Sequence, residues 1–333
     1  MRSELLSQLL KEVSRSFYLT LRILPPAIRP QIGLAYLLAR TTDTIADTGV
    51  VALESRLSAL AQLRDRIAGA SSVRLDFGTL ASNQSLPAEK ILLERADDSV
   101  ALLNEFSAAD QQLIRDVLAV ITGGQELDLR RFSGAAQKNV VALQSDSELD
   151  DYTFRVAGCV GQFWTRICHA HLFPQLAIEQ LLPDAIRFGK GLQLINILRD
   201  LPRDLRNGRC YIPEPRLADI NLTPYDLLDQ KNEPRFRPLY EEYISLAASH
   251  IQAGWDYTNS LPFTNVRLRL ACAWPILIGA KTLSRLKSEA VLDPNDIIKV
   301  PRREVRQLIV RSVTLYPFRK AWQSQICSGF PGN

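Results

Sequence analysis

Apolar residues recur at intervals of three and four positions along most of the chain. The first group consists of Leu5, Leu6, Leu9, Leu10 and Val13. The same spacing continues in four longer stretches, at residues 88–106, 110–131, 152–172 and 240–258. Such spacing gathers apolar side chains on one face of a helix, whereas the strict alternation typical of β-strands is nearly absent. The pattern therefore predicts an all-α protein.

One predicted helix, within IRPQIGLAYLLARTTDTIADTGV (28–50), is apolar almost all round and carries a single polar stripe. The stripe consists of Tyr36, Arg40, Asp43 and Asp47, which follow one another at spacings of four, three and four residues. These spacings place the four side chains on one helix face. A helix with so much apolar surface should be buried. Its carboxylates must then meet a partner, a ligand or a wet cavity, because burying an unpaired carboxylate is costly.

A second predicted helix, within LPDAIRFGKGLQLINILRDLPRD (182–204), repeats this design. Its stripe consists of Gly189, Gln193, Asn196, Asp200 and Asp204. Both stripes end in two aspartates four residues apart, and Cβ atoms at that helical spacing lie about 6 Å from each other. Such carboxylates repel each other as bare anions but are well placed to share divalent cations. Oxygen ligands suit Mg²⁺, which keeps several waters and accepts phosphate oxygens, and they also suit Mn²⁺.

The alternative is that neighbouring arginines neutralise these aspartates. The candidate partners are Arg40 for Asp43, and Arg203, Arg206 or Arg209 for Asp204. A single D-x-x-x-D pair would favour this alternative. Two pairs, each at the end of a polar stripe on an apolar helix, favour a metal site instead. Nearby arginines are compatible with it, because a diphosphate bridged by Mg²⁺ still needs basic neighbours for its remaining charge.

The composition is that of a globular protein without a disulfide framework. The chain has 333 residues, 46% of them hydrophobic, which is enough for a sizeable core. Its five cysteines lack disulfide or zinc-site spacing, which indicates a reducing, cytoplasmic environment. The most apolar stretch, LRLACAWPILIGAKTL (268–283), is too short to span a bilayer and contains Pro275, so it predicts a buried helix. The net charge of +4 permits loose contact with anionic lipid, whereas the dispersed arginines argue against nucleic acid as a partner.

Six ordered motifs resemble those of the squalene/phytoene synthases, and most of all those of bacterial squalene synthases. The motifs are SRSFY (14–18), YLLARTTD (36–43), DTIAD (43–47), FRVAGCVG (154–161), DLPRD (200–204) and LQLINILRD...NGRCYIP (192–213). The similarity covers about residues 14–286. It implies the all-α isoprenoid synthase fold, with one domain over residues 1–333 and helices around a central apolar cavity.

The resemblance also implies a reaction and a set of site residues. Members of the family condense two farnesyl diphosphates head to head with the help of Mg²⁺, and squalene synthases reduce the presqualene diphosphate intermediate with NADPH. The implied metal ligands are Asp43, Asp47, Asp200 and Asp204, with Tyr36 as a further catalytic residue. The implied diphosphate contacts are Ser14, Arg15, Ser16, Arg40, Arg199, Arg209 and Tyr211. The implied cavity residues are Gln193, Asn196, Gly158 and Gly161, although the glycines fit close packing better. Arg15 as a solvated side chain and Tyr36 as a core tyrosine remain alternatives.

The chain departs from the family pattern at two places. Many relatives carry YC-x-x-VAG, whereas this chain has YTFRVAG (152–158), so a tyrosine role cannot be placed on Phe154 or Arg155. The second departure is Pro202, which stands between Asp200 and Asp204 and removes a backbone donor from the predicted helix. It predicts that Asp204 lies on a bent or frayed last turn.

The motif LLARTTDTIADT (37–48) favours squalene as the product, without deciding whether NADPH is used. The alternatives are synthases that stop at presqualene diphosphate or make dehydrosqualene or phytoene, and a non-catalytic isoprenoid-binding protein. The last would be expected to lose aspartates, and all four are present. A head-to-tail chain elongator is disfavoured because its D-D-x-x-D motif is missing. We expect a monomer in the cytoplasm, or peripheral at the inner face of a bacterial membrane where an apolar product could be released.

Overall fold

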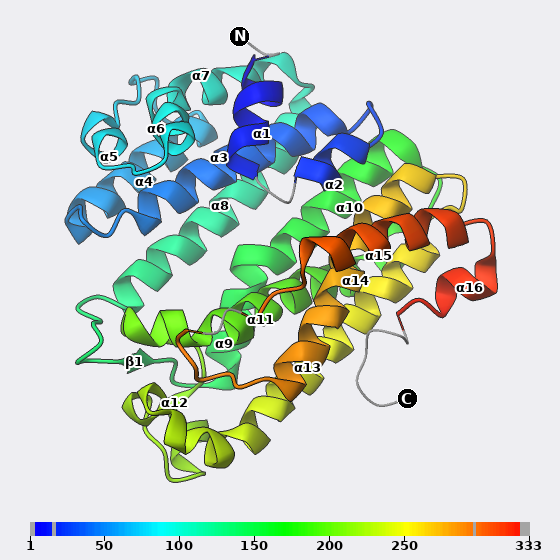
Figure 1. Ribbon diagram of the computed structural model, residues 1–333. Coiled ribbons are helices and arrows are strands. Elements are labelled where there is room, and N and C mark those ends of the chain that lie inside the picture. The colour runs from blue at the N-terminus through cyan, green and yellow to red at the C-terminus, as the bar shows by residue number, and fades with distance from the viewer. Residues whose placement is uncertain (1–3, 15–17, 296–297, 327–333) are drawn as a thin grey trace. The chain divides into compact units, whose positions relative to one another are not determined.

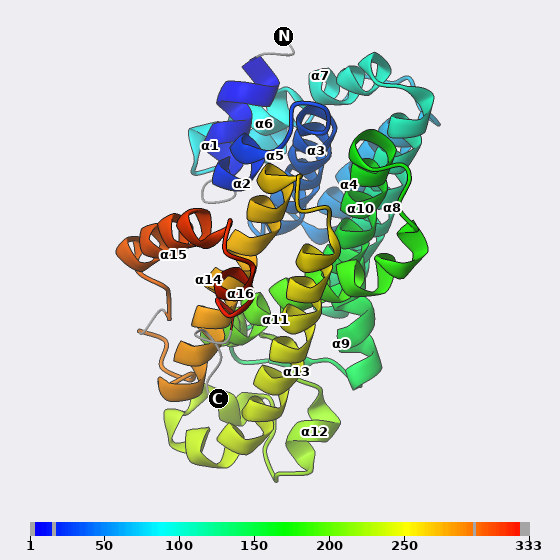
Figure 2. The ribbon, with the colours of Figure 1, turned by 90° about the vertical axis from the view of Figure 1, so that its right-hand side faces the viewer.

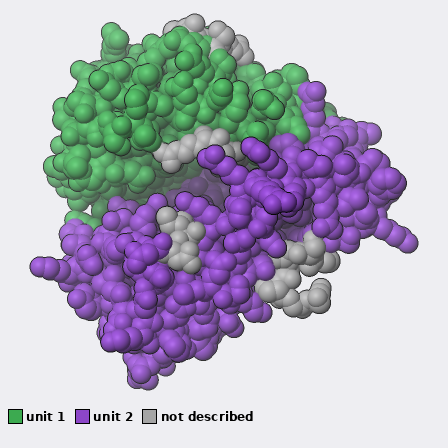
Figure 3. Space-filling model, in the orientation of Figure 1, with its two compact units in different colours: residues 1–133, 162–178 green, residues 134–161, 179–333 purple. Residues whose placement is uncertain are grey.

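The computed structural model describes residues 4–14, 18–295 and 298–326. Helices make up most of this part of the chain (Figure 1), and the prediction of an all-α protein is confirmed. The chain divides into two compact units, residues 1–133 with 162–178 and residues 134–161 with 179–333 (Figure 3). The single domain implied by the resemblance stays a prediction.

The first unit is a group of helices packed around α3. Its elements are η1 (Glu4–Leu9), α1 (Leu10–Ser14), α2 (Tyr18–Ile23), α3 (Arg29–Asp47), α4 (Leu53–Ala68), α5 (Gly78–Ser82), α6 (Pro87–Glu94), α7 (Ala96–Ala101), η3 (Leu102–Glu105), α8 (Ala108–Arg131) and most of α10 (Cys159–Leu172). α3 packs against α4, α6, α7 and α8. Its side chains Leu34, Leu37 and Leu38 are completely buried, as the apolar circumference of this helix predicts.

The second unit is built around α11. Its elements are β1 (Val141–Ala142), α9 (Asp146–Thr153), η4 (Phe154–Gly158), α11 (Leu182–Arg206), β2 (Arg209–Cys210), α12 (Glu214–Ala218), η6 (Tyr225–Leu228), η7 (Gln230–Asn232), α13 (Glu233–Ser260), α14 (Val266–Ser288), α15 (Arg302–Leu315) and α16 (Arg319–Gln323), with η5 (Ile178–Gln180) at its boundary. β1 and β2 form a short parallel pair. α11 packs against α13, α14 and η4, and Figures 1 and 2 both show α11, α13 and α14 side by side.

Two glycines let α11 approach the segment before it very closely. A Cβ atom at Gly161 would lie 1.9 Å from the carbonyl oxygen of Ala185, and one at Gly189 would lie 2.1 Å from the carbonyl oxygen of Ala157. No side chain fits at those distances, so only glycine permits this backbone-to-backbone packing. Gly161 is therefore a close-packing position, which is the alternative to a ligand contact expected from the sequence.

Pro202 does not interrupt α11, which continues to Arg206. Proline removes the N–H that would donate to the Leu198 carbonyl, four residues back. The Tyr240 hydroxyl of α13 donates to that carbonyl oxygen instead, at 3.1 Å, and Tyr240 is completely buried. The prediction of a frayed last turn is therefore wrong, because α11 stays helical through Asp204 to Arg206. A bend at this turn stays a prediction.

The apolar stretch around Pro275 forms part of α14, whose inner positions are buried, as predicted. Among the described residues, no helix is both long enough and apolar enough to cross a membrane.

Candidate active site

Arg40, Asp43 and Asp47 lie along one face of α3 in the first unit. The Arg40 Nη1 atom is 4.0 Å from Asp43 Oδ2, at the outer limit of an ion pair. Its Nη2 atom donates to Glu89 Oε1 of α6 at 2.5 Å. Glu89 is therefore the main partner of Arg40, and the ion pair between Arg40 and Asp43 expected from the alternative is present only as a long contact.

Asp43 has a second neighbour, Gln125 of α8, whose Nε2 atom donates to Asp43 Oδ1. Neither Gln125 nor Glu89 was predicted from the sequence. A sequence signal for Gln125 existed, since Thr122, Gln125 and Asp128 recur at three-residue spacing in α8, and all three are buried. This is the same kind of polar stripe that identified the aspartates.

The environment of Asp43 disfavours its charged form. The side chain is 47% exposed, yet surrounding protein removes part of its hydration and raises the pKa of Asp43 to about 6, with repulsion from Asp47 adding to the rise. Arg40 and the hydrogen bond from Gln125 oppose this effect. The negative charge of these two adjacent carboxylates is only partly neutralised by their neighbours, so binding a divalent cation would stabilise their charged forms.

Two buried polar atoms beside Asp43 also lack partners. Within the described residues, Arg40 Nε and Gln125 Oε1 make no hydrogen bond. Unsatisfied buried polar atoms are uncommon in proteins. An anion carried by a hydrated cation would offer the acceptor and the donor that these two atoms lack.

Asp200 and Asp204 lie four residues apart on α11 in the second unit. Arg199 donates two hydrogen bonds to Asp200, from Nε to Oδ1 at 2.9 Å and from Nη2 to Oδ2 at 2.8 Å. These bonds raise the pKa of Arg199 above its usual value. Arg203 lies 3.3 Å from Asp200 and 3.8 Å from Asp204. Its side chain is 69% exposed, so both contacts are weak. Arg199 and Arg203 thus surround this pair with positive charge.

Several other predicted residues lie near this pair within the second unit. Asn196 Nδ2 is 3.4 Å from Gln193 Oε1, on the half-buried stripe that precedes Asp200. Tyr211 is buried, and its ring stacks on that of Tyr152 with centroids 4.7 Å apart and hydroxyl groups 3.3 Å apart. Arg209 lies in β2, three residues after the end of α11.

The remaining predicted residues have different environments. Ser14 is buried, and its hydroxyl donates to the Leu10 carbonyl oxygen at 2.5 Å. Tyr36 is half-buried on α3, one turn before Arg40. At Gly158, a Cβ atom would touch side chains at 3.1–3.3 Å, so this position is tightly packed. Arg15 and Ser16 lie outside the described residues.

The donor set of each pair fits Mg²⁺ that arrives with diphosphate. In the part of the chain that the structure describes, no group of three or more His, Cys, Asp or Glu side chains could hold a metal. Each pair therefore supplies two carboxylates. Mg²⁺ commonly binds proteins through one or two carboxylates and completes its shell with water and phosphate oxygens, so two carboxylates suffice.

Comparisons with known proteins show which family the chain resembles. The model of the family described as squalene/phytoene synthase matches residues 10–304. The 15-cis-phytoene synthase of Synechocystis sp. is 30% identical over 257 residues, which cover 75% of this chain and 66% of that protein. The presqualene diphosphate synthase of Zymomonas mobilis is 29% identical over 249 residues, covering 75% and 73%. The solved structure of TcSQS with a ligand has a TM-score of 0.81 at 20% identity, covering 98% of this chain and 90% of that one.

The family match places the chain in the class of the head-to-head prenyl-diphosphate synthases. The chain belongs to the squalene/phytoene synthase family, whose members are prenyltransferase-type enzymes. The isoprenoid synthase fold expected from the sequence is confirmed by the structural likeness.

Proposed function

We propose that this protein condenses two farnesyl diphosphates head to head, through presqualene diphosphate, and reduces that intermediate with NADPH to squalene. The observation that carries the proposal is the pair of carboxylates on each of two largely apolar helices, Asp43 with Asp47 and Asp200 with Asp204, each beside arginines. A non-catalytic binding protein would have no need for both pairs.

The first half of the reaction breaks the C–O bond of one diphosphate. The double bond of the second substrate attacks the resulting allylic cation, and loss of a proton closes the cyclopropane ring. Bound Mg²⁺ supplies charge neutralisation for the leaving diphosphate. Arg40 and Arg199 are placed beside the aspartates to bind the remaining phosphate charge.

The arginine contacts suggest how each pair is prepared for its ligand. Arg199 holds the Asp200 carboxylate through both of its oxygens, which keeps that side chain in one orientation. Glu89 holds Arg40 at a long distance from Asp43, so the guanidinium does not neutralise the carboxylate by itself. Both arginines can therefore bind a phosphate oxygen and still keep the contacts described here, Arg40 with Glu89 and Arg199 with Asp200.

In the second half, the C–O bond to the remaining diphosphate breaks and the carbon skeleton rearranges. Hydride from NADPH then gives squalene, with NADP⁺ as the oxidised co-product. Without hydride, loss of a proton gives dehydrosqualene, and arrest before the second C–O bond breaks leaves presqualene diphosphate. One relative above is named a presqualene diphosphate synthase, which makes that compound an alternative product, and the other is named a phytoene synthase, which adds phytoene.

The decisive experiment is incubation of the full chain with farnesyl diphosphate and Mg²⁺, with and without NADPH, followed by mass spectrometry of the extract. Squalene that forms only with NADPH supports the proposal. Dehydrosqualene in the presence of NADPH, or presqualene diphosphate as the end product, assigns the protein to an alternative. If geranylgeranyl diphosphate is consumed and farnesyl diphosphate is not, the product is phytoene.

A further inference from the structure

The positive charge of this protein is concentrated in one short segment near its C-terminus. Residues 299–320 contain seven basic side chains and one acidic side chain, Glu304. Their net charge is thus +6, whereas the whole chain carries +4. The rest of the protein is therefore slightly acidic, and this segment alone accounts for its basic character.

These basic side chains have no carboxylate partner among the residues that the structure describes. They are Lys299, Arg302, Arg303, Arg306, Arg311, Arg319 and Lys320. Among the described residues, none of them forms a salt bridge, whereas Glu304 is paired with Arg285 of α14 at 2.8 Å. The single acidic group is thus already neutralised, and the charge of the segment faces solvent unopposed.

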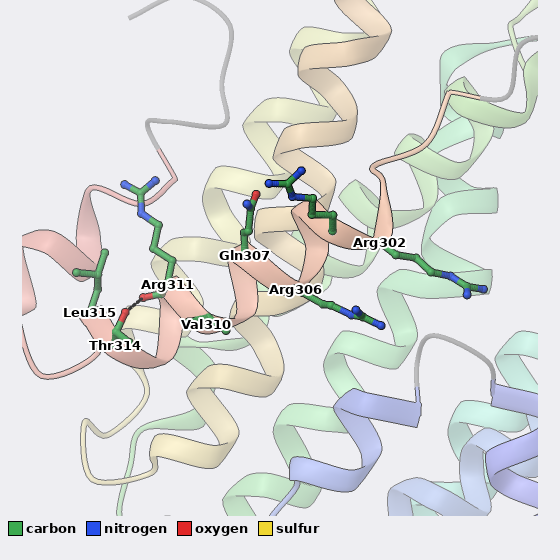
Figure 4. A pocket seen from close by; sticks show the side chains of 8 residues that line it. Arg302, Arg306, Gln307, Val310, Arg311, Thr314 and Leu315 are labelled. Atoms are coloured by element: carbon green, nitrogen blue, oxygen red, sulfur yellow. Dashed lines mark hydrogen bonds between the residues drawn. The ribbon is translucent and has the colours of Figure 1, made fainter.

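α15 holds four of these arginines and presents two distinct faces. Its inner face carries Ser312, which is buried and accepts a hydrogen bond from Trp274 Nε1 of α14 at 3.0 Å. Its outer face carries Arg302, Arg306 and Val310 at spacings of four residues. Figure 4 shows Arg302 and Arg306 extending from one side of α15 and Arg311 from the other, so that the guanidinium groups spread out around the helix.

Apolar side chains lie between these arginines and remain open to water. Val310 is 61% exposed and Val313 is 48% exposed, and Phe318, just after the helix, is 64% exposed. In a helical projection, Val310 and Val313 share the outward face with Arg302 and Arg306. A helix that mixes exposed apolar residues with unpaired arginines is typical of segments that lie in a membrane interface.

We propose that residues 299–320, which comprise α15, the residues that flank it and the first two residues of α16, dock onto the surface of an anionic phospholipid bilayer. The guanidinium and ammonium groups meet lipid phosphates, while Val310, Val313 and Phe318 enter the boundary between head groups and acyl chains. Nucleic acid fits less well, because two of these three apolar groups are aliphatic and cannot stack on bases. An acidic protein would use the same charges but has no need of the exposed apolar side chains.

Membrane docking would serve the proposed function, because a long hydrocarbon product does not dissolve in water. The docking itself does not depend on that function. The two proposals are tested separately. Vesicle binding requires no substrate, and turnover can be measured in detergent without vesicles.

The test is co-sedimentation of the full chain with vesicles of phosphatidylcholine alone or of equal parts phosphatidylcholine and phosphatidylglycerol. We expect binding to the anionic vesicles only, weakened by high salt. The variant Arg303→Gln/Arg306→Gln/Arg311→Gln should bind about 100-fold less tightly, since each basic residue near such a surface contributes about fivefold. The matched control is Lys138→Gln/Lys231→Gln/Lys287→Gln, which removes the same charge from exposed positions elsewhere and should bind nearly as well as the original.

A second measurement reports the depth of α15. Val310→Trp should show a blue shift of its added fluorescence, and quenching by brominated lipid, when anionic vesicles are present. Tyr225→Trp, at an exposed position of η6, should show neither. The proposal fails if the arginine and lysine variants lose binding equally, or if the tryptophan at position 310 stays in water. It also fails if the arginine variant loses affinity for an RNA or DNA oligonucleotide while its vesicle binding is unchanged.

Discussion

The hydroxyl group of Tyr240 lies 3.1 Å from the carbonyl oxygen of Leu198, the acceptor that Pro202 leaves without its usual helical donor. A buried side chain of α13 thus donates the hydrogen bond that this carbonyl of α11 lacks. Asp200 and Asp204 lie on either side of the proline, so this contact supports the part of α11 that carries both carboxylates.

The first prediction concerns this hydrogen bond. Tyr240→Phe leaves the buried Leu198 carbonyl unsatisfied, so the free energy of unfolding should fall by about 1–3 kcal/mol. Pro202→Ala returns an N–H to the same carbonyl, so the loss caused by Tyr240→Phe should be much smaller in that background. Urea denaturation of the two single variants and the double variant measures this coupling. Tyr225→Phe, at an exposed tyrosine, is the control. Equal losses in both backgrounds would show that Tyr240 acts only through packing.

The second prediction concerns the carboxylates. Asp43→Asn and Asp200→Asn should each lower kcat for consumption of farnesyl diphosphate by about 1,000-fold, because a neutral amide cannot hold the divalent cation that neutralises the leaving group. Asp219→Asn, at an exposed position of the second unit, should leave the rate unchanged. Unaltered turnover in Asp43→Asn or Asp200→Asn would return that pair to the role of a structural ion pair.

The third prediction concerns close packing. Gly161→Ala would force the backbone at position 161 away from Ala185 of α11, because the new Cβ atom would lie 1.9 Å from that residue's carbonyl oxygen. We expect a loss of about 2–4 kcal/mol in the free energy of unfolding. Gly123→Ala in α8 is the matched control, because nothing lies within 4 Å of a Cβ atom there. It should be neutral or stabilising by about 0.5–1 kcal/mol. A neutral Gly161→Ala would disprove the tight contact.

The fourth prediction concerns pH. Burial lowers the pKa of His250 to about 4, and the charges of Arg187 and Lys190 lower it further. In the unfolded chain the same group titrates near its ordinary value of about 6.5. The unfolded state therefore binds more protons between these values, and stability should fall as pH falls from about 6.5 toward 4. The melting temperature of His250→Gln should depend less on pH in this range. An unchanged slope would mean that other groups cause the loss of stability.

The fifth prediction concerns the thiols. Among the described residues, the buried cysteines are Cys159, Cys168, Cys210 and Cys272. Burial raises the pKa values of Cys159 and Cys210 to about 12, so almost none of these groups is in the reactive thiolate form at neutral pH. Iodoacetamide applied to the native protein should leave all four unmodified, as peptide mass spectrometry can show. Rapid labelling of any of them would mean that its helix opens readily.

The sequence alone predicted the helical class, the family and the polar stripes of α3 and α11. These features are local, because helical spacing places residues three and four apart on one face whatever the rest of the chain does. The motifs around Asp43, Asp47, Asp200 and Asp204 are likewise contiguous in the sequence. For that reason they could be recognised without coordinates.

Only the tertiary structure decided what surrounds these carboxylates. Gln125 reaches Asp43 across 82 positions, and Tyr240 reaches the Leu198 carbonyl across 42. No local rule anticipates such contacts, because they depend on which helix faces which in the packed protein. From the sequence, proline is known to remove the hydrogen bond to the Leu198 carbonyl. The sequence does not show that Tyr240 of another helix supplies a donor instead. The sequence therefore located the carboxylates, whereas packing determined that Asp204 lies in a continuous helix and that protein around Asp43 raises its pKa.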